Sequence, residues 1–257
     1  MMLFVMILSR LVPIMMLLAL TLVGSRYVYD LVFPQRSRLA PWAFATVSLI
    51  GLMATAPYVW RATLMIGGHW ALSHHRWQLA DVLLSDYDAW GGRTTDTVGR
   101  EWAFANMNLD RWQTAKEVLL KVPRPTKQTV LLIGLCQYYL QDPAAEATLK
   151  SIPDALMVEI QVRDYLLARL AQRRGEIGHA YMLYWRAASI QPHFLPAVYH
   201  GARLTMLGGD ANSALQIVNG YARKFPGAST DPDVLTLRSY ISSHRVPPDK
   251  EYEIVAF

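Results

Sequence analysis

The feature that most constrains this chain is a residue pattern that occurs twice, 34 residues apart, between residues 161 and 228. The first copy comprises Tyr165, Ala168, Arg169, Gly175, Ala180, Tyr184, Ala187 and Pro192, and the second comprises Tyr199, Ala202, Arg203, Gly209, Ala214, Val218, Tyr221 and Pro226. Six of the eight pairs are identical. A match that covers whole repeats favours stacked structural units over an ordinary helical bundle with chance spacing.

The residue types suit two antiparallel helices in each copy. Ala168 and Ala180 are small where the two helices would approach closely, and Gly175 falls between them, where a left-handed residue can end the first helix. Pro192 would stop the second helix and open the next repeat. A period of 34 with these residues resembles the tetratricopeptide repeat (TPR) family. The resemblance implies a helical solenoid that binds other proteins and rarely catalyses reactions.

Weaker echoes extend this pattern in both directions. The segment Arg76–Ala80 (Arg-Trp-Gln-Leu-Ala) is matched by Arg111–Ala115 (Arg-Trp-Gln-Thr-Ala) 35 residues later, although no glycine precedes either segment. Residues 127–153 form a shortened unit with Gly134 at the small position, and Asp231-Pro232 starts a terminal helix. We therefore predict about five helical hairpins and a C-terminal capping helix over residues 61–245, followed by an extended tail, residues 246–257.

The first 60 residues are markedly apolar. Residues 2–24 and 40–60 are each long enough to span a bilayer as a helix, and a short polar link joins them. No small-x-small cleavage site follows the first run, which favours a membrane helix over a signal peptide. The predicted fold class is therefore all-α, with a two-helix transmembrane hairpin (residues 1–60) ahead of the solenoid. The apolar character continues to Leu72, which predicts a direct connection into the first hairpin, with Gly67-Gly68 as a place where it could bend.

This anchor predicts an integral protein of the inner (cytoplasmic) membrane with two spans. The positive-inside count is tied, with three arginines in the link and three in the outer flanks. Counting Arg10 as an N-terminal flank favours a cytoplasmic TPR domain.

Composition and single residues argue against catalysis. The chain is 53% hydrophobic and 18% charged, and it has no basic run that would predict nucleic-acid binding. Its one cysteine, Cys136, excludes an internal disulfide and lies in an apolar run that predicts a buried thiol. His69, His74 and His75 lack further ligands at coordinating spacing, so we expect no metal site, no cofactor and no enzyme.

The resemblance to TPR proteins also implies a concave groove lined by first-helix residues. It maps the candidate partner-binding residues onto Tyr165, Arg169, Gln172, Tyr199, Arg203 and Met206. A ladder of tyrosines and arginines would suit an acidic or aromatic peptide, because arginine can hold a carboxylate with two hydrogen bonds. The alternative, that the tyrosines pack between helices and the arginines are merely solvated, remains open at this stage.

These features predict a membrane-anchored scaffold that positions a protein partner, such as another subunit of an inner-membrane complex. The layout is similar to that of the inner-membrane TPR subunit of Pel exopolysaccharide secretion, which implies a role in polysaccharide synthesis and export. The alternative is a periplasmic assembly factor or holdase, similar to the TPR proteins of haem and cytochrome c maturation.

Overall fold

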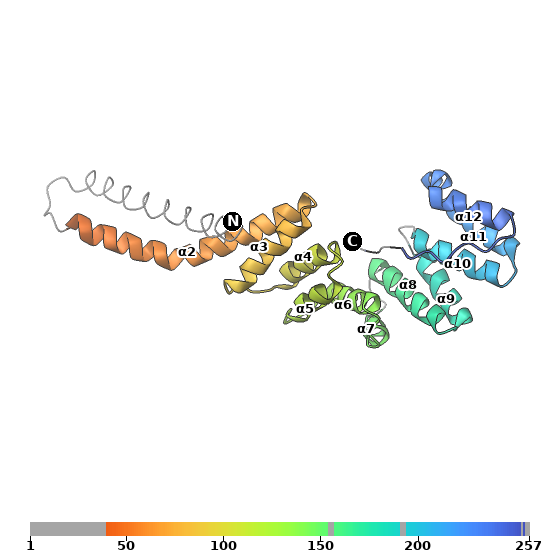
Figure 1. The fold of residues 1–257 in the computed structure, drawn as a ribbon, viewed down its shortest axis with the longest axis horizontal. Coiled ribbons are helices and arrows are strands. Elements are labelled where there is room, and N and C mark those ends of the chain that lie inside the picture. Colours follow the sequence, from red (N-terminus) through yellow and green to blue (C-terminus); the bar gives the residue numbers. More distant parts are fainter. Residues whose placement is uncertain (1–39, 154–156, 191–193, 253, 255–257) are drawn as a thin grey trace, which may run out of the picture. The chain divides into compact units, whose positions relative to one another are not determined.

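The computed structural model describes residues 40–153, 157–190, 194–252 and 254. Within these ranges every regular element is a helix (Figure 1). The helices are α2 (Ala40–Ser73), α3 (Trp77–Ala89), α4 (Asp96–Met107), α5 (Trp112–Leu120), α6 (Lys127–Tyr139), α7 (Ala145–Lys150), α8 (Met157–Arg173), α9 (Ile177–Ser189), α10 (Leu195–Leu207), α11 (Ala211–Lys224), the 3-10 turn η1 (Pro226–Thr230) and α12 (Pro232–Ser242).

The chain divides into two compact units. The described part of the first comprises residues 40–70 and 82–92, and the second comprises residues 71–81 together with those from Arg93 onward. In the first unit, Gly68 lets α2 and α3 approach closely, because a Cβ built there would lie 2.6 Å from Leu84 Cδ2. The glycines of the predicted bend therefore serve packing, and α2 runs through them to Ser73 without a break.

The second unit is a series of helical hairpins. Neighbouring helices in sequence pack against each other from α4 to α12, and α4 also packs on α6, α6 on α8, and α10 on α12. This arrangement, in which each hairpin contacts the next one, is consistent with an α-solenoid. The helix starting at Pro232 begins where the sequence predicts it, since Asp231 accepts hydrogen bonds from the backbone N–H groups of Asp233 and Val234.

The turns that follow the first helix of each pair repeat with great regularity. A residue with positive φ follows each of six helices: His75, Asp110, Gln141, Gly175, Gly209 and His244, with φ between 53° and 83°. Their separations are 35, 31, 34, 34 and 35 residues. Only two of the six are glycine, so the turn geometry is imposed by the packing at four positions where the side chain opposes it. This explains why the glycine rule found only two of the repeats.

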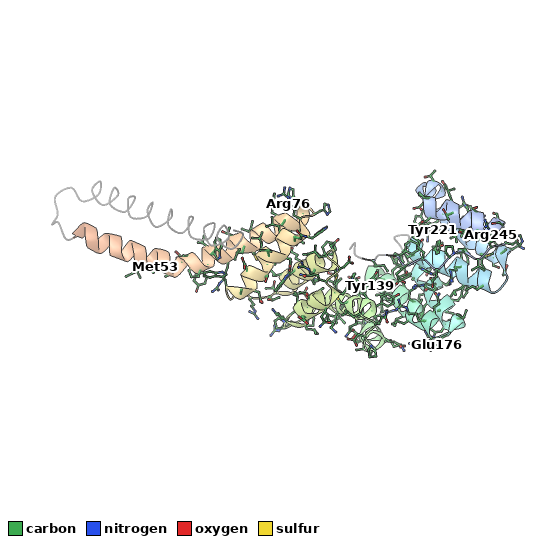
Figure 2. All side chains as sticks on the ribbon, viewed as in Figure 1. Met53, Arg76, Tyr139, Glu176, Tyr221 and Arg245 are labelled. Carbon is green, nitrogen blue, oxygen red and sulfur yellow. The ribbon has the colours of Figure 1, made fainter. Side chains whose placement is uncertain are left out.

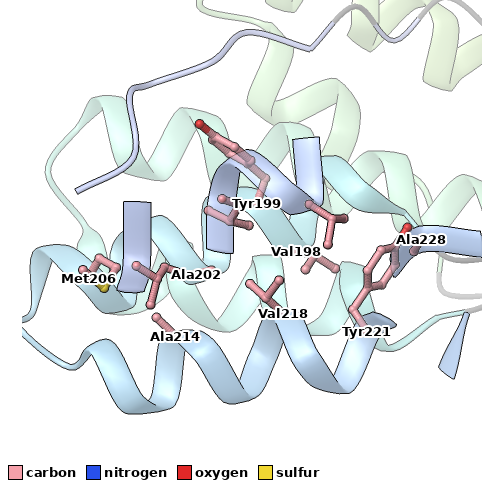
Figure 3. Close-up of a cluster of buried hydrophobic side chains, with 11 residues drawn as sticks. Val198, Tyr199, Ala202, Met206, Ala214, Val218, Tyr221 and Ala228 are labelled. Atoms are coloured by element: carbon pink, nitrogen blue, oxygen red, sulfur yellow. The ribbon is translucent and has the colours of Figure 1, made fainter. Parts of the chain in front are cut away.

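The small positions of the repeat lie between the paired helices. All seven alanines in question are completely buried: Ala80, Ala103, Ala115, Ala168, Ala180, Ala202 and Ala214. Gly134 plays the same role in the shortened hairpin, because a Cβ there would lie 2.6 Å from Leu149 Cδ2. At the C-terminal end, residues of α10, α11 and α12 form one hydrophobic cluster (Figure 3), in which the Tyr199 hydroxyl is directed away from Ala214 and Val218.

The predicted transmembrane hairpin needs correction. None of the helices in the described ranges is both long enough and apolar enough to cross a membrane. Although α2 has 34 residues, polar and small residues such as Thr55, Arg61, Gly67 and His69 interrupt its apolar ones. The prediction of a span over residues 40–60 is therefore wrong, and so is the two-span localisation in the inner membrane. The other predicted span, residues 2–24, lies outside the described residues.

Candidate functional site

The site is built where the chain stops forming helices. After α12 and the left-handed His244, Pro247 and Pro248 supply no backbone N–H and disfavour a further helix. The described residues that follow, 246–252 and 254, are called the C-terminal tail, and they have no regular secondary structure. Figure 2 labels Tyr139 at the end of α6 and Arg245 just before the tail. The tail contacts the first helices of three hairpins, α6, α8 and α10.

Arg169 of α8 is the centre of these contacts. Its Nη1 donates to Asp249 Oδ1 at 2.7 Å, and its Nη2 donates to Glu251 Oε2 at 2.6 Å. The Arg169 side chain is only 5% exposed, whereas the two carboxylate side chains are 46% and 47% exposed. One buried guanidinium therefore holds two partly exposed carboxylates of the tail.

Side chains of α6 and α8 complete the grip on Glu251. The Tyr138 hydroxyl donates to Glu251 Oε1 at 2.7 Å and accepts a hydrogen bond from Arg173 Nη2 at 2.9 Å. The guanidinium of Arg173 also lies over the Tyr138 ring, 4.4 Å from its centroid. Both oxygens of the Glu251 carboxylate are thus held by hydrogen-bond donors.

The backbone of the tail is bound as well. Arg203 Nε donates to the Pro247 carbonyl at 3.0 Å, and the Tyr199 hydroxyl donates to the Pro248 carbonyl at 3.2 Å. The Tyr139 hydroxyl donates to the Tyr252 carbonyl at 3.2 Å. These three contacts come from α10 and α6, so side chains on separate hairpins bind successive peptide groups.

Aromatic and charged contacts fix the remaining tail side chains. The Tyr252 ring lies edge-on to Tyr199, with 5.6 Å between ring centroids. Lys250 Nζ pairs with Asp233 of α12 at 2.6 Å. The tail is therefore held on both of its sides along a stretch of six residues, Pro247 to Tyr252.

The charges at this face shift the pKa values of the groups around it. Burial by itself would raise the pKa values of Asp249 and Glu251, but hydrogen bonds from Arg169 and Tyr138 and the positive charge of Arg169 lower both overall. Burial first, and then Arg169, lowers the pKa of His200 to about 4. His200 is therefore neutral near pH 7, with its Nδ1 only 3.4 Å from Arg169 Nη1.

The six predicted groove residues divide into two groups. Arg169, Arg203 and Tyr199 contact the tail, as described above. Tyr165 is instead buried against the rings of Tyr184, Phe194 and His200, and Met206 belongs to the hydrophobic cluster of α10 to α12. Gln172 accepts a hydrogen bond from the Tyr184 hydroxyl.

Both sequence interpretations of this ladder therefore apply in part. Tyr165 packs between helices, whereas Arg169 is buried and not solvated. No described contact involves a partner protein, and partner binding by these residues stays a prediction.

Sequence reasoning missed Tyr138, Arg173 and His200. Tyr138 lies 34 residues before Gln172, so carrying the repeat phase one unit further back would have placed it on the same stripe. The shortened third hairpin, with its 31-residue spacing, concealed that register. The role of the tail has no such signal, because only the packing shows where it lies.

In the ranges that the structure describes, no group of three His, Cys, Asp or Glu side chains could hold a metal ion. Comparison of the chain with protein-family models, with curated proteins and with solved structures finds no significant match.

Proposed function

We propose that this chain is a non-catalytic helical-repeat scaffold of the tetratricopeptide type, which holds a protein partner through the face formed by α6, α8 and α10. The observation that carries the proposal is the extended segment already seated on that face. Arg169 binds its acidic side chains, and Arg203 and Tyr199 bind its backbone carbonyls. A surface that satisfies both kinds of group has the chemistry to bind a peptide in the same conformation.

The repeat organisation supports the same function. Hairpins that each contact the next one produce a surface longer than any single helix pair. Left-handed turns at intervals of 31 to 35 residues keep the first helices of successive hairpins in equivalent positions. Side chains at equivalent positions, such as Tyr165 and Tyr199 or Arg169 and Arg203, then recur along the array.

The kind of contact favours an adaptor over a holdase. A holdase for unfolded chains would bind through apolar surface without requiring particular charges. The contacts to the tail are mainly charge-assisted hydrogen bonds, which specify the ligand more closely than apolar contacts do. The proposal includes no membrane anchor, because the described helices do not support one.

The test compares two charge reversals on the full chain. Arg203→Glu alters a residue that binds the tail backbone, and Arg223→Glu makes the same change on α11, where Arg223 is exposed and hydrogen-bonded to the Asn219 carbonyl. Proteins that co-purify with the wild type and with Arg223→Glu, but are lost with Arg203→Glu, would support the proposal. An unchanged set of proteins with both variants, or no co-purifying protein with the wild type, would contradict it.

A further inference from the structure

The tail shows which ligand chemistry this face accepts. Its core is Asp249-Lys250-Glu251-Tyr252, and alternate residues of an extended segment point to the same side. Asp249 and Glu251 accordingly share one guanidinium, while Lys250 pairs with Asp233. The bound element is thus two carboxylates two residues apart, followed directly by an aromatic ring.

The two halves of the contact differ in burial. Arg169 belongs to the face, since it is 5% exposed and is also within hydrogen-bonding distance of Tyr138 and His200. The carboxylates of the tail are nearly half exposed. The cation is therefore a fixed part of the surface, whereas the acidic segment is the part that another chain of like chemistry can replace.

We propose that this face recognises, in a partner protein, an extended segment with two carboxylates two residues apart followed by an aromatic residue, and that the chain's own tail occupies the face as an intramolecular competitor. This inference rests on the proposed scaffold function and names the ligand class of the same face. A tail tethered by a few residues has an effective concentration in the millimolar range. A partner segment of equal intrinsic affinity binds only after it displaces the tail.

The experiment uses the full chain and a fluorescent peptide of residues 246–257 as the probe. In the variant Asp249→Asn/Glu251→Gln, the tail remains but loses both charges that Arg169 binds. We expect this variant to bind the probe at least tenfold more tightly than the wild type does, measured by fluorescence anisotropy. No gain in affinity would overturn the proposal.

Two further substitutions locate the binding. Arg169→Gln, added to the double variant, should remove the gain in affinity. Arg174→Gln is the matched control, because Arg174 pairs with Glu146 and Glu176, and it should leave the gain unchanged. A gain that survives Arg169→Gln would place the peptide elsewhere and contradict the proposal.

A second measurement does not depend on the folding of any variant. On the wild-type chain, the native peptide should bind at least tenfold more tightly than a peptide with Asp249→Asn and Glu251→Gln. Equal affinities would overturn the proposal. Light scattering covers the exchange of tails between two copies, since a dimer that dissociates in the double variant would assign the face to a second copy and overturn the role of a partner segment.

The two proposals can fail separately. If the peptide does not bind, the ligand class is wrong, although proteins lost with Arg203→Glu would still support a scaffold. If the peptide binds as expected but no protein depends on Arg203, the scaffold function fails while the chemistry of the face stands.

Discussion

Arg169 of α8 and Glu251 of the C-terminal tail are 82 residues apart in sequence, yet Arg169 Nη2 lies 2.6 Å from Glu251 Oε2. The same guanidinium binds Asp249 through its other terminal nitrogen. A buried arginine that is neutralised by two residues of the tail makes the tail part of the folded structure. The stability of the second unit and the occupancy of its binding face are therefore coupled.

Replacing Arg169 should measure this coupling. Arg169→Gln removes two charge-assisted hydrogen bonds and should lower the free energy of unfolding by about 2 kcal/mol, a value kept small because the carboxylates can return to water. Arg174→Gln should cost less, since its ion pairs are exposed and screened by solvent. Urea denaturation of both variants checks this, and equal losses would show that the tail contacts contribute nothing special.

Stability should fall as the pH drops from about 6.5 to about 4. His200 has a pKa of about 4 in the folded protein, against an ordinary value of 6.5, so the unfolded chain takes up a proton in this range and the folded chain does not. The loss should be on the order of 3 kcal/mol. Asp249 and Glu251, whose pKa values are lowered, lose their contribution at still lower pH, as the pH falls through their folded-state values.

Chemical denaturation at a series of pH values tests this dependence, with His200→Gln as the comparison. The variant should show a flatter profile between pH 6.5 and 4. A wild-type profile that is already flat over this range would show that His200 is not held neutral in the fold.

Two glycines in helices should respond oppositely to alanine. At Gly134 a Cβ would meet Leu149 Cδ2 at 2.6 Å, and Leu149 is fully buried, so Gly134→Ala should cost about 1–3 kcal/mol. At Gly220 of α11 a Cβ would meet nothing within 4 Å, so Gly220→Ala should stabilise by about 0.5–1 kcal/mol. Thermal unfolding of both variants gives the two signs, and a stabilising Gly134→Ala would show that α6 and α7 are packed less closely.

The thiol of Cys136 should be inert in the folded protein. It is completely buried in α6, and burial raises its pKa to about 12, so almost no thiolate exists near pH 8. Reaction with a disulfide reagent should be very slow without denaturant and complete in urea. Rapid reaction of the folded chain would mean that this part of α6 opens readily.

The sequence by itself determined the local and periodic properties of this protein. The 34-residue spacing identified where the two regular hairpins lie, because a small residue is required wherever two helices approach closely, and Ala168, Ala180, Ala202 and Ala214 are all fully buried. The cap at Asp231 is also a local interaction, in which one carboxylate accepts from N–H groups two and three residues on.

Only the tertiary structure decided how these elements are used. Apolar composition alone predicted a membrane span over residues 40–60, but the same apolar residues also serve helix packing, as Leu64 shows by being 3% exposed. Left-handed turns at His75, Asp110 and Gln141 carry no glycine, so packing sets their geometry. The seat of the tail on α6, α8 and α10 joins residues more than 40 positions apart, and such contacts follow from the arrangement of the hairpins, which no local pattern encodes.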